Sequence, residues 1–148
     1  MNSIQLARLL RCFGTLCGVL LSLLAMPATA GDRIVGGQWE AAMTTDGDTR
    51  TVTFCISSAE AASINGDSKS GREFAEQKAT KSGAPCAINA YDIKGDTVSY
   101  TLSCGQRVIT DRTTFHGDTS EGVKTVVSAG TTVSTQVKSR RIGACPTG

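Results

Sequence analysis

Apolar and polar residues alternate along most of the chain after residue 85, which is the pattern of half-buried β-strands. The clearest example runs from Cys86 to Cys104, where two alternating stretches flank the loop Lys94-Gly95-Asp96. Alternation around a loop that contains glycine predicts a β-hairpin. With the turn centred on Gly95, the pairs expected opposite each other are Ile88 with Leu102, Ala90 with Tyr100, Asp92 with Val98, and Cys86 with Cys104.

This register gathers almost every apolar side chain of the hairpin on one face of the sheet. A slip of one residue would distribute the same side chains over both faces, so the register is well specified. Tyr100 and Leu102 lie on the apolar face, and we expect both side chains to be largely buried.

A second hairpin is expected nearer the N-terminus, and it is followed by a change of pattern. Strands at 38–45 and 50–56 flank the turn Asp46-Gly47-Asp48. The capping patterns Ser57-Ser-Ala-Glu60 and Ser70-Gly-Arg-Glu73 then predict short helices over 59–64 and 72–81. One short helical excursion therefore interrupts a chain that is otherwise rich in strands.

Three more strands are predicted after the central hairpin, separated by turns at 116–122 and 129–130. Regular short strands joined by Gly and Asp turns are typical of an antiparallel meander. The sequence thus predicts a mainly β fold, a curved antiparallel sheet or a partly closed barrel. The predicted strands cover Val108–Phe115, Val123–Ser128 and Thr131–Arg141.

The first thirty residues have the three parts of a secretory signal peptide. Arg8 and Arg11 precede an apolar run over 12–25, and an A-x-A cleavage site ends at Ala30. The apolar run is too short to span a bilayer as a helix. The sequence predicts a signal peptide over 1–30 and a single β-rich domain over 31–148, with no membrane span in the mature chain.

Removal of the signal peptide would leave a formally neutral protein. Arg8 and Arg11 are the only charged residues before residue 31, and 13 basic and 13 acidic groups follow. Bulk electrostatic binding to nucleic acid needs a surplus of basic groups. We therefore expect no nucleic-acid partner.

Four cysteines remain after residue 30, and an even number in an exported chain of this size predicts two disulfides. The hairpin register favours Cys86 with Cys104, which leaves Cys55 for Cys145. The rival pairing is sequential, Cys55 with Cys86 and Cys104 with Cys145. No two of the four cysteines are close enough in sequence to form the pairs typical of a zinc site, so no metal or other cofactor is expected.

Candidate catalytic residues are few. His116 is the only histidine, and a general base needs a nucleophile or an orienting carboxylate within reach. Asp118 and Glu121 are near in sequence, but a His-Gly-Asp turn is more often a solvated loop. A hydrolase using His116 is therefore the weakest of the functions considered.

Four aromatic residues could line a cavity if the sheet curves around one. An apolar cavity of at least ~300 Å³, reached by Trp39 and Tyr100, would favour a carrier of a small apolar ligand. The ordinary alternative for such residues is the core. The four possible ligand-facing residues are Trp39, Tyr91, Tyr100 and Phe115.

Several segments together resemble a known family. These are Gly37–Glu40, Thr53–Ile56, Ser58–Ala62, Gly95–Tyr100, Phe115–Gly122 and Arg140–Pro146. In this order they resemble the bacterial exported proteins grouped as domain-of-unknown-function family 3617. The resemblance covers nearly the whole chain after residue 31 and includes the four cysteines. It implies export and a fold, and it carries over no catalytic or binding residue.

These observations predict a small exported protein, periplasmic or secreted by a bacterium and stabilised by disulfides. The first hypothesis is a non-enzymatic binding module or a module that interacts with an envelope protein. The second is a carrier that holds a small apolar ligand in the concave face of the sheet.

Overall fold

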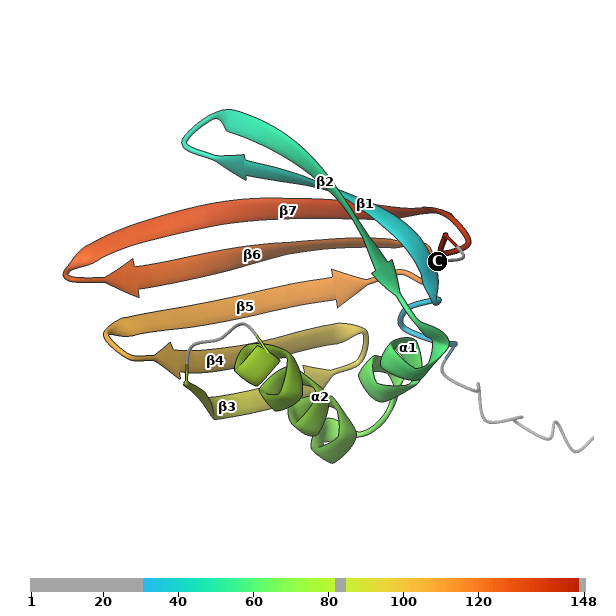
Figure 1. The fold of residues 1–148 in the computed structure, drawn as a ribbon, viewed down its shortest axis with the longest axis horizontal. Helices are drawn as coiled ribbons and strands as arrows, with labels where there is room; N and C mark the ends of the chain where they lie inside the picture. The colour runs from blue at the N-terminus through green and yellow to red at the C-terminus, as the bar shows by residue number, and fades with distance from the viewer. Residues whose placement is uncertain (1–30, 82–84, 147–148) are drawn as a thin grey trace, which may run out of the picture.

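The computed structural model describes residues 31–81 and 85–146 (Figure 1). The expected signal peptide, 1–30, lies outside the described residues. Within the described part, seven strands and two helices are present. The strands are β1 (Gly37–Thr45), β2 (Asp48–Ile56), β3 (Cys86–Lys94), β4 (Thr97–Cys104), β5 (Arg107–Phe115), β6 (Thr119–Ser128) and β7 (Thr131–Gly143), and the helices are α1 (Ser58–Asn65) and α2 (Ser68–Lys81).

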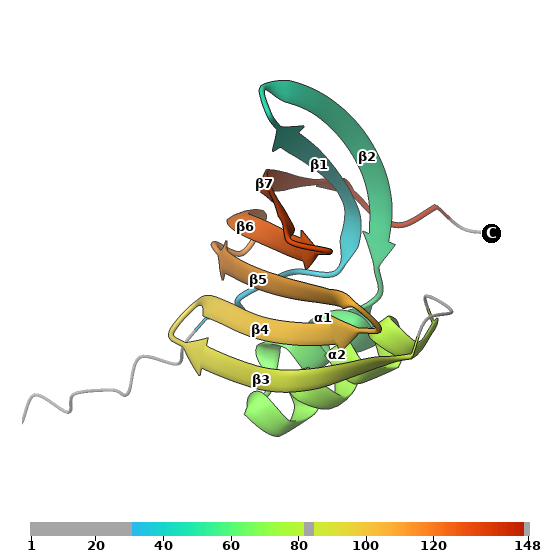
Figure 2. The ribbon, with the colours of Figure 1, turned by 90° about the vertical axis from the view of Figure 1, so that its left-hand side faces the viewer.

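All seven strands belong to one sheet with the order β2-β1-β7-β6-β5-β4-β3, and each neighbouring pair is antiparallel. Strands β3 to β7 form the expected meander, and β1 joins its far side by pairing with β7. The sheet is strongly curved, and β2 arches over towards the helices beside β3 and β4 (Figure 2). The prediction of a curved antiparallel sheet is confirmed, and the strands do not close into a barrel because β2 and β3 remain at the edges.

Two predicted turns are shorter than expected. Asp48 already pairs with Thr45, so the first turn is Asp46-Gly47, and strand β6 begins at Thr119. Asp46 and Gly47 both have positive φ, as the two central residues of a tight hairpin turn require. The polar residues 119–122 therefore lie in a strand, a position that their composition did not suggest.

The register of the central hairpin is only partly as predicted. Cys86 lies opposite Cys104 and Ile88 opposite Leu102, but the register then shifts between Ile88 and Ala90. A β-bulge adds one unpaired residue to one strand and so exchanges the faces of the residues that follow. The expected pairs Ala90 with Tyr100 and Asp92 with Val98 were wrong. The observed pairs are Ala90 with Thr101, Tyr91 with Tyr100, and Ile93 with Val98.

Helix α1 has the predicted capping box, with reciprocal bonds between Ser57 and Glu60. The predicted start of the second helix was wrong, since α2 begins at Ser68. Its first turn is satisfied by Asp67, whose Oδ1 accepts hydrogen bonds from both the backbone N–H and the hydroxyl of Ser70. Ser70 therefore acts as a donor inside the first turn, rather than as the capping acceptor.

The two disulfides are Cys86–Cys104 and Cys55–Cys145, the pairing that the hairpin register favoured. Cys86–Cys104 joins facing residues of β3 and β4. Cys55–Cys145 joins edge strand β2 to the segment that follows β7, and its cysteines are 90 residues apart. The rival sequential pairing is not observed.

The dry core is small. Ile34, Trp39 and Ala61 form its buried cluster, and Ile56, Ile64 and Phe115 pack against it. Tyr100 and Leu102 were expected to be largely buried, but both are only half-buried. The reason is that both side chains line a cavity.

Neither described helix is long and apolar enough to cross a membrane.

Candidate functional site

A cavity of about 470 Å³ lies between the concave face of the sheet and the two helices. Every strand contributes at least one residue to its walls, and β3 contributes Tyr91. Side chains along a strand point alternately to the two faces of the sheet, and β4 follows this pattern most fully, because Val98, Tyr100 and Leu102 all line the cavity. The inner-face apolar residues in the walls include Trp39, Phe54, Val98, Tyr100, Leu102, Phe115 and Val137.

All four aromatic residues predicted to face a ligand line this cavity: Trp39, Tyr91, Tyr100 and Phe115. Tyr91 reaches it because of the bulge between Ile88 and Ala90, which turns Tyr91 to the same face as Tyr100. The rings of Tyr91 and Tyr100 are stacked, with centroids 6.3 Å apart. The structure thus brings together residues that come from four different strands.

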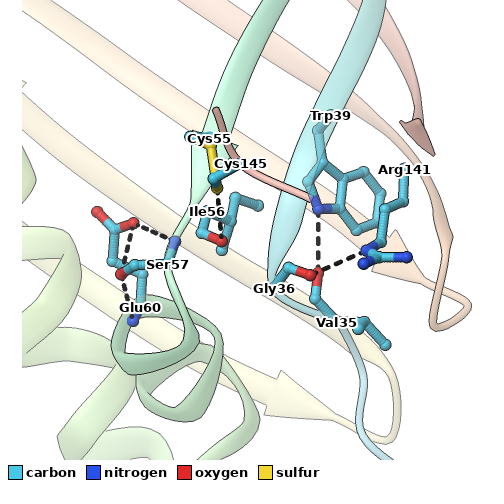
Figure 3. Close-up of a disulfide and its surroundings, with 9 residues drawn as sticks. All are labelled: Val35, Gly36, Trp39, Cys55, Ile56, Ser57, Glu60, Arg141 and Cys145. Atoms are coloured by element: carbon cyan, nitrogen blue, oxygen red, sulfur yellow. Dashed lines mark hydrogen bonds between the residues drawn. A yellow bond between two sulfur atoms is a disulfide. The ribbon is translucent and has the colours of Figure 1, made fainter. Parts of the chain in front are cut away.

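Trp39 belongs both to the dry core and to the cavity wall. Its side chain is 0% exposed, and its indole Nε1 donates a 3.0 Å hydrogen bond to the carbonyl of Val35 (Figure 3). Arg141 Nε donates to the neighbouring carbonyl of Gly36 at 2.9 Å. These two bonds hold the segment before β1 against the sheet, so the position of the indole is fixed.

Helix α1 is fastened to the same segment by two polar side chains. Arg33 donates to the carbonyls of Ile64, Asn65 and Gly66 at the C-terminal end of the helix. The side chain of Asn65 accepts from the backbone N–H of Ile34 at 2.9 Å and donates to the carbonyl of Ile34 at 2.8 Å. A cation at a helix C-terminus also meets the negative end of the helix dipole.

Helix α2 forms the opposite wall and packs against β3. It approaches the sheet closely at Gly71, where an added Cβ would lie 2.1 Å from the Tyr91 hydroxyl oxygen. Further along, Phe74, Ala75, Lys78 and Ala79 face the cavity. Glycine at position 71 therefore lets the start of the helix touch the sheet, while larger side chains later in the helix border the open space.

An ion pair borders the helical side of the cavity. Lys78 pairs with Glu60 of α1, and its ammonium group also lies 5.5 Å from the centre of the Phe74 ring. Hydrogen bonds from Lys78 and from the backbone of Ser57 lower the pKa of Glu60 below its usual value. Glu60 is therefore ionised at neutral pH and neutralises the lysine beside it.

Sequence reasoning missed Asp111, a half-buried carboxylate in the cavity wall. Thr113 Oγ1 donates a 2.8 Å hydrogen bond to its Oδ1, and Lys124 Nζ lies 3.9 Å from its Oδ2. Burial raises the pKa of Asp111, although the bond from Thr113 and the charge of Lys124 oppose this effect. A signal was present in the sequence, because Asp111 shares its face of the strand with Ile109 and Phe115.

Burial also raises the pKa values of the two stacked tyrosines. For Tyr100 the negative charge of Asp111, with which its hydroxyl interacts, adds to the effect of burial. For Tyr91 the positive charge of Arg33 opposes it. Both hydroxyls are therefore protonated, neutral hydrogen-bonding groups at physiological pH.

His116 lies elsewhere, exposed at the turn between β5 and β6 and outside the cavity lining. Its backbone N–H donates to the carbonyl of Thr119, which makes it part of the turn itself. Within residues 31–81 and 85–146, no group of three or more His, Cys, Asp or Glu residues could hold a metal ion.

Comparison with known proteins identifies a family but no activity. A family model described as "Protein of unknown function (DUF3617)" matches residues 34–145. No curated protein and no solved structure matches the chain. The match includes all seven strands, both helices and the four paired cysteines. The chain therefore belongs to the DUF3617 family of proteins of unknown function.

Proposed function

We propose that this protein is a non-enzymatic carrier that binds a small apolar ligand in the concave face of its sheet. The observation that carries the proposal is the cavity of about 470 Å³, whose walls are mostly apolar and include Trp39 and Tyr100. Pockets that bind small molecules typically enclose about 300–1,000 Å³ and are lined by apolar and aromatic side chains with few polar groups. The cavity fits this description in size and in lining.

The small dry core supports the same proposal. A sheet of seven strands with one apolar face would normally be filled by side chains packed at crystal-like density. Here Phe54 is 41% exposed although it faces the cavity, and Leu102 is only half-buried. Apolar surface left without a partner inside a fold is accounted for if a ligand covers it.

Binding can be tested with N-phenyl-1-naphthylamine, an uncharged apolar dye that fluoresces strongly when it leaves water. Adding the purified protein should increase the fluorescence of the dye, and the increase should saturate. The variant Ala75→Trp places a large ring in the cavity from α2 and should abolish the increase. Gln77→Trp adds the same ring to an exposed position of the same helix and should bind the dye as the wild type does. Equal binding by both variants would refute the proposal.

We also propose that the protein works outside the cytoplasm, in the bacterial periplasm or after secretion. The cleavage pattern that ends at Ala30 and the two disulfides support this location, because disulfides persist in oxidising compartments. N-terminal sequencing of the protein from the periplasmic fraction should begin at Gly31. A chain that still begins at Met1 in that fraction would contradict cleavage.

A further inference from the structure

The cavity contains one polar group that the binding of a purely apolar ligand leaves unexplained. Asp111 extends from β5 into the wall, opposite Tyr100 of β4 and Lys124 of β6 in the strand register. Its side chain is 13% exposed, which is low for a carboxylate. An aspartate that shares a face with Leu102, Val98 and Phe115 is costly to the fold, so its presence requires a reason.

The carboxylate of Asp111 has unused capacity to accept hydrogen bonds. A carboxylate offers about four lone-pair sites on two oxygens. Thr113 occupies one site on Oδ1, and the hydroxyl of Tyr100 also interacts with the group. Lys124 is 3.9 Å from Oδ2, which is an ion-pair distance but too long for a hydrogen bond. With about four sites and two such partners, the carboxylate can accept a further donor from a bound molecule.

The other charges that line the cavity do not offset Asp111, and Lys124, which partly offsets it from 3.9 Å, lies outside the lining. Among the described lining residues, the charged side chains besides Asp111 are Glu60 and Lys78, and these two are paired with each other. A ligand with a carboxylate head would meet the negative charge of Asp111 and find Lys78 already neutralised. A ligand whose head donates hydrogen bonds or carries a positive charge would relieve the cost of burying Asp111.

We propose that the ligand is an amphiphile with an apolar chain and a hydrogen-bond-donating head, an amine or an alcohol. The head binds the carboxylate of Asp111 and lies beside the hydroxyl of Tyr100, while the chain lies against the apolar side chains on the β1–β2 side of the cavity. The ring of Phe54, which is 41% exposed, lies on that side. This inference rests on the carrier function and specifies the class of ligand that the carrier accepts.

Competition against N-phenyl-1-naphthylamine tests the head group alone if the chain is kept constant. Dodecylamine, dodecanol and dodecanoate share one chain and differ in their heads, and each is added below its aggregation concentration at neutral pH. Dodecylamine should displace the dye at a concentration at least about tenfold lower than dodecanoate, with dodecanol between them; tenfold corresponds to about 1.4 kcal/mol.

The variant Asp111→Asn removes the charge and keeps the size of the side chain. It should still bind the dye, and the ratio between dodecanoate and dodecylamine should fall to about one. Asp92→Asn is the matched control, since Asp92 is an exposed aspartate on β3 that also has a lysine neighbour, Lys94, at 3.2 Å. This variant should keep the wild-type ratio.

Two results would overturn the inference and leave the carrier function intact. One is that dodecanoate displaces the dye from the wild type as well as dodecylamine does. The other is that Asp111→Asn keeps the wild-type preference. If the wild-type protein does not bind the dye at all, the carrier function fails, and the ligand class fails with it.

Discussion

The apolar interior has a closed part, the dry core, and an open part, the cavity, which meet at residues such as Ile34 and Trp39 and differ in how far their side chains are buried. In the dry core, Ile34, Trp39 and Ala61 are buried against one another. In the cavity, Leu102 and Tyr100 lie on the same face of the same sheet but remain half-buried. Side-chain type does not explain the difference, because both regions contain large aromatic and aliphatic residues.

The difference lies in how the covering segments are held. Arg33 and Asn65 fasten the segment before β1 to the end of α1, so this segment and α1 close tightly over the dry core. Helix α2 touches the sheet at Gly71, and the paired side chains of Glu60 and Lys78 border the space beyond. The segment with more polar fastening thus covers the filled part of this face, whereas α2, which is bonded to the sheet by Arg72 at the carbonyl of Ile88, borders the open part.

The largest expected effect is in the dry core. Trp39→Ala should lower the free energy of unfolding by ~3–5 kcal/mol, because a fully buried ring leaves a void that the fastened segments cannot fill. Urea unfolding followed by circular dichroism measures this, since the variant lacks the only tryptophan. Phe54→Ala is the control. Phe54 lies opposite Trp39 in the β1–β2 register, and its truncation should cost ~1 kcal/mol or less because the ring is 41% exposed. Equal losses would remove the distinction between the regions.

Breaking the polar fastening should have an intermediate effect. Asn65→Ala leaves the backbone N–H and C=O of Ile34 without their side-chain partner, and a buried unpaired polar group costs ~1–3 kcal/mol. The same urea experiment measures the loss. Asn89→Ala removes an exposed asparagine whose side chain bonds to Ser103, and it should change stability by less than about 0.5 kcal/mol. If Asn65→Ala were equally harmless, fastening would not explain the closed core.

Truncation in the cavity wall should cost less. Leu102→Ala should lower the free energy of unfolding by about 1 kcal/mol, because a half-buried side chain beside an existing cavity creates no new void. Its cross-strand neighbour Ile88 is buried and lies outside the cavity lining. Ile88→Ala should therefore lower the free energy of unfolding by ~2–5 kcal/mol. A loss for Leu102→Ala as large as that for Ile88→Ala would mean that the cavity is packed in solution.

The smallest expected effect is an increase in stability, for the variant Asp111→Asn. The pKa of Asp111 is raised by burial above its ordinary value of 3.8, so the folded state favours the protonated carboxyl. As the pH rises through the raised pKa, ionisation of Asp111 destabilises the folded state relative to the unfolded state. Asp111→Asn should therefore unfold at a higher urea concentration than the wild type at pH 7. The gain should shrink as the pH falls towards about 4. A variant less stable than the wild type at pH 7 would show that the ionised group stabilises the fold.

The alternation of residues was sufficient to predict the strands, and the turn chemistry predicted most of their connections. The bulge between Ile88 and Ala90 was missed, although the interval of three between Ile88 and Tyr91 breaks the period of two expected on one face. The start of α2 was missed because the Ser70…Glu73 pattern matched a capping box, whereas Asp67 forms the cap three residues earlier.

The candidate site was predicted in part. The four aromatic residues were named from the sequence, but the predicted register placed Tyr91 on the opposite face from Tyr100, and only the bulge brings it to the inner face. The distance between the helices and the sheet could not be predicted, since it depends on contacts such as Gly71 with Tyr91, which are distant in the sequence. Without that distance, the same residues are compatible with a filled core, and Asp111 has no cavity to face.

The strand order has a consequence for the order of folding. Among themselves, strands β3 to β7 pair in the order of the sequence, so this part of the sheet forms from local contacts, which close quickly. Strand β1 instead pairs with β7, and Glu40 meets Arg140 across 100 residues of chain. During synthesis, the β1–β2 hairpin is made first but has no place in the sheet until β7 has been completed. We expect it to dock last, and the Cys55–Cys145 bond, which spans this junction, to form only after that docking.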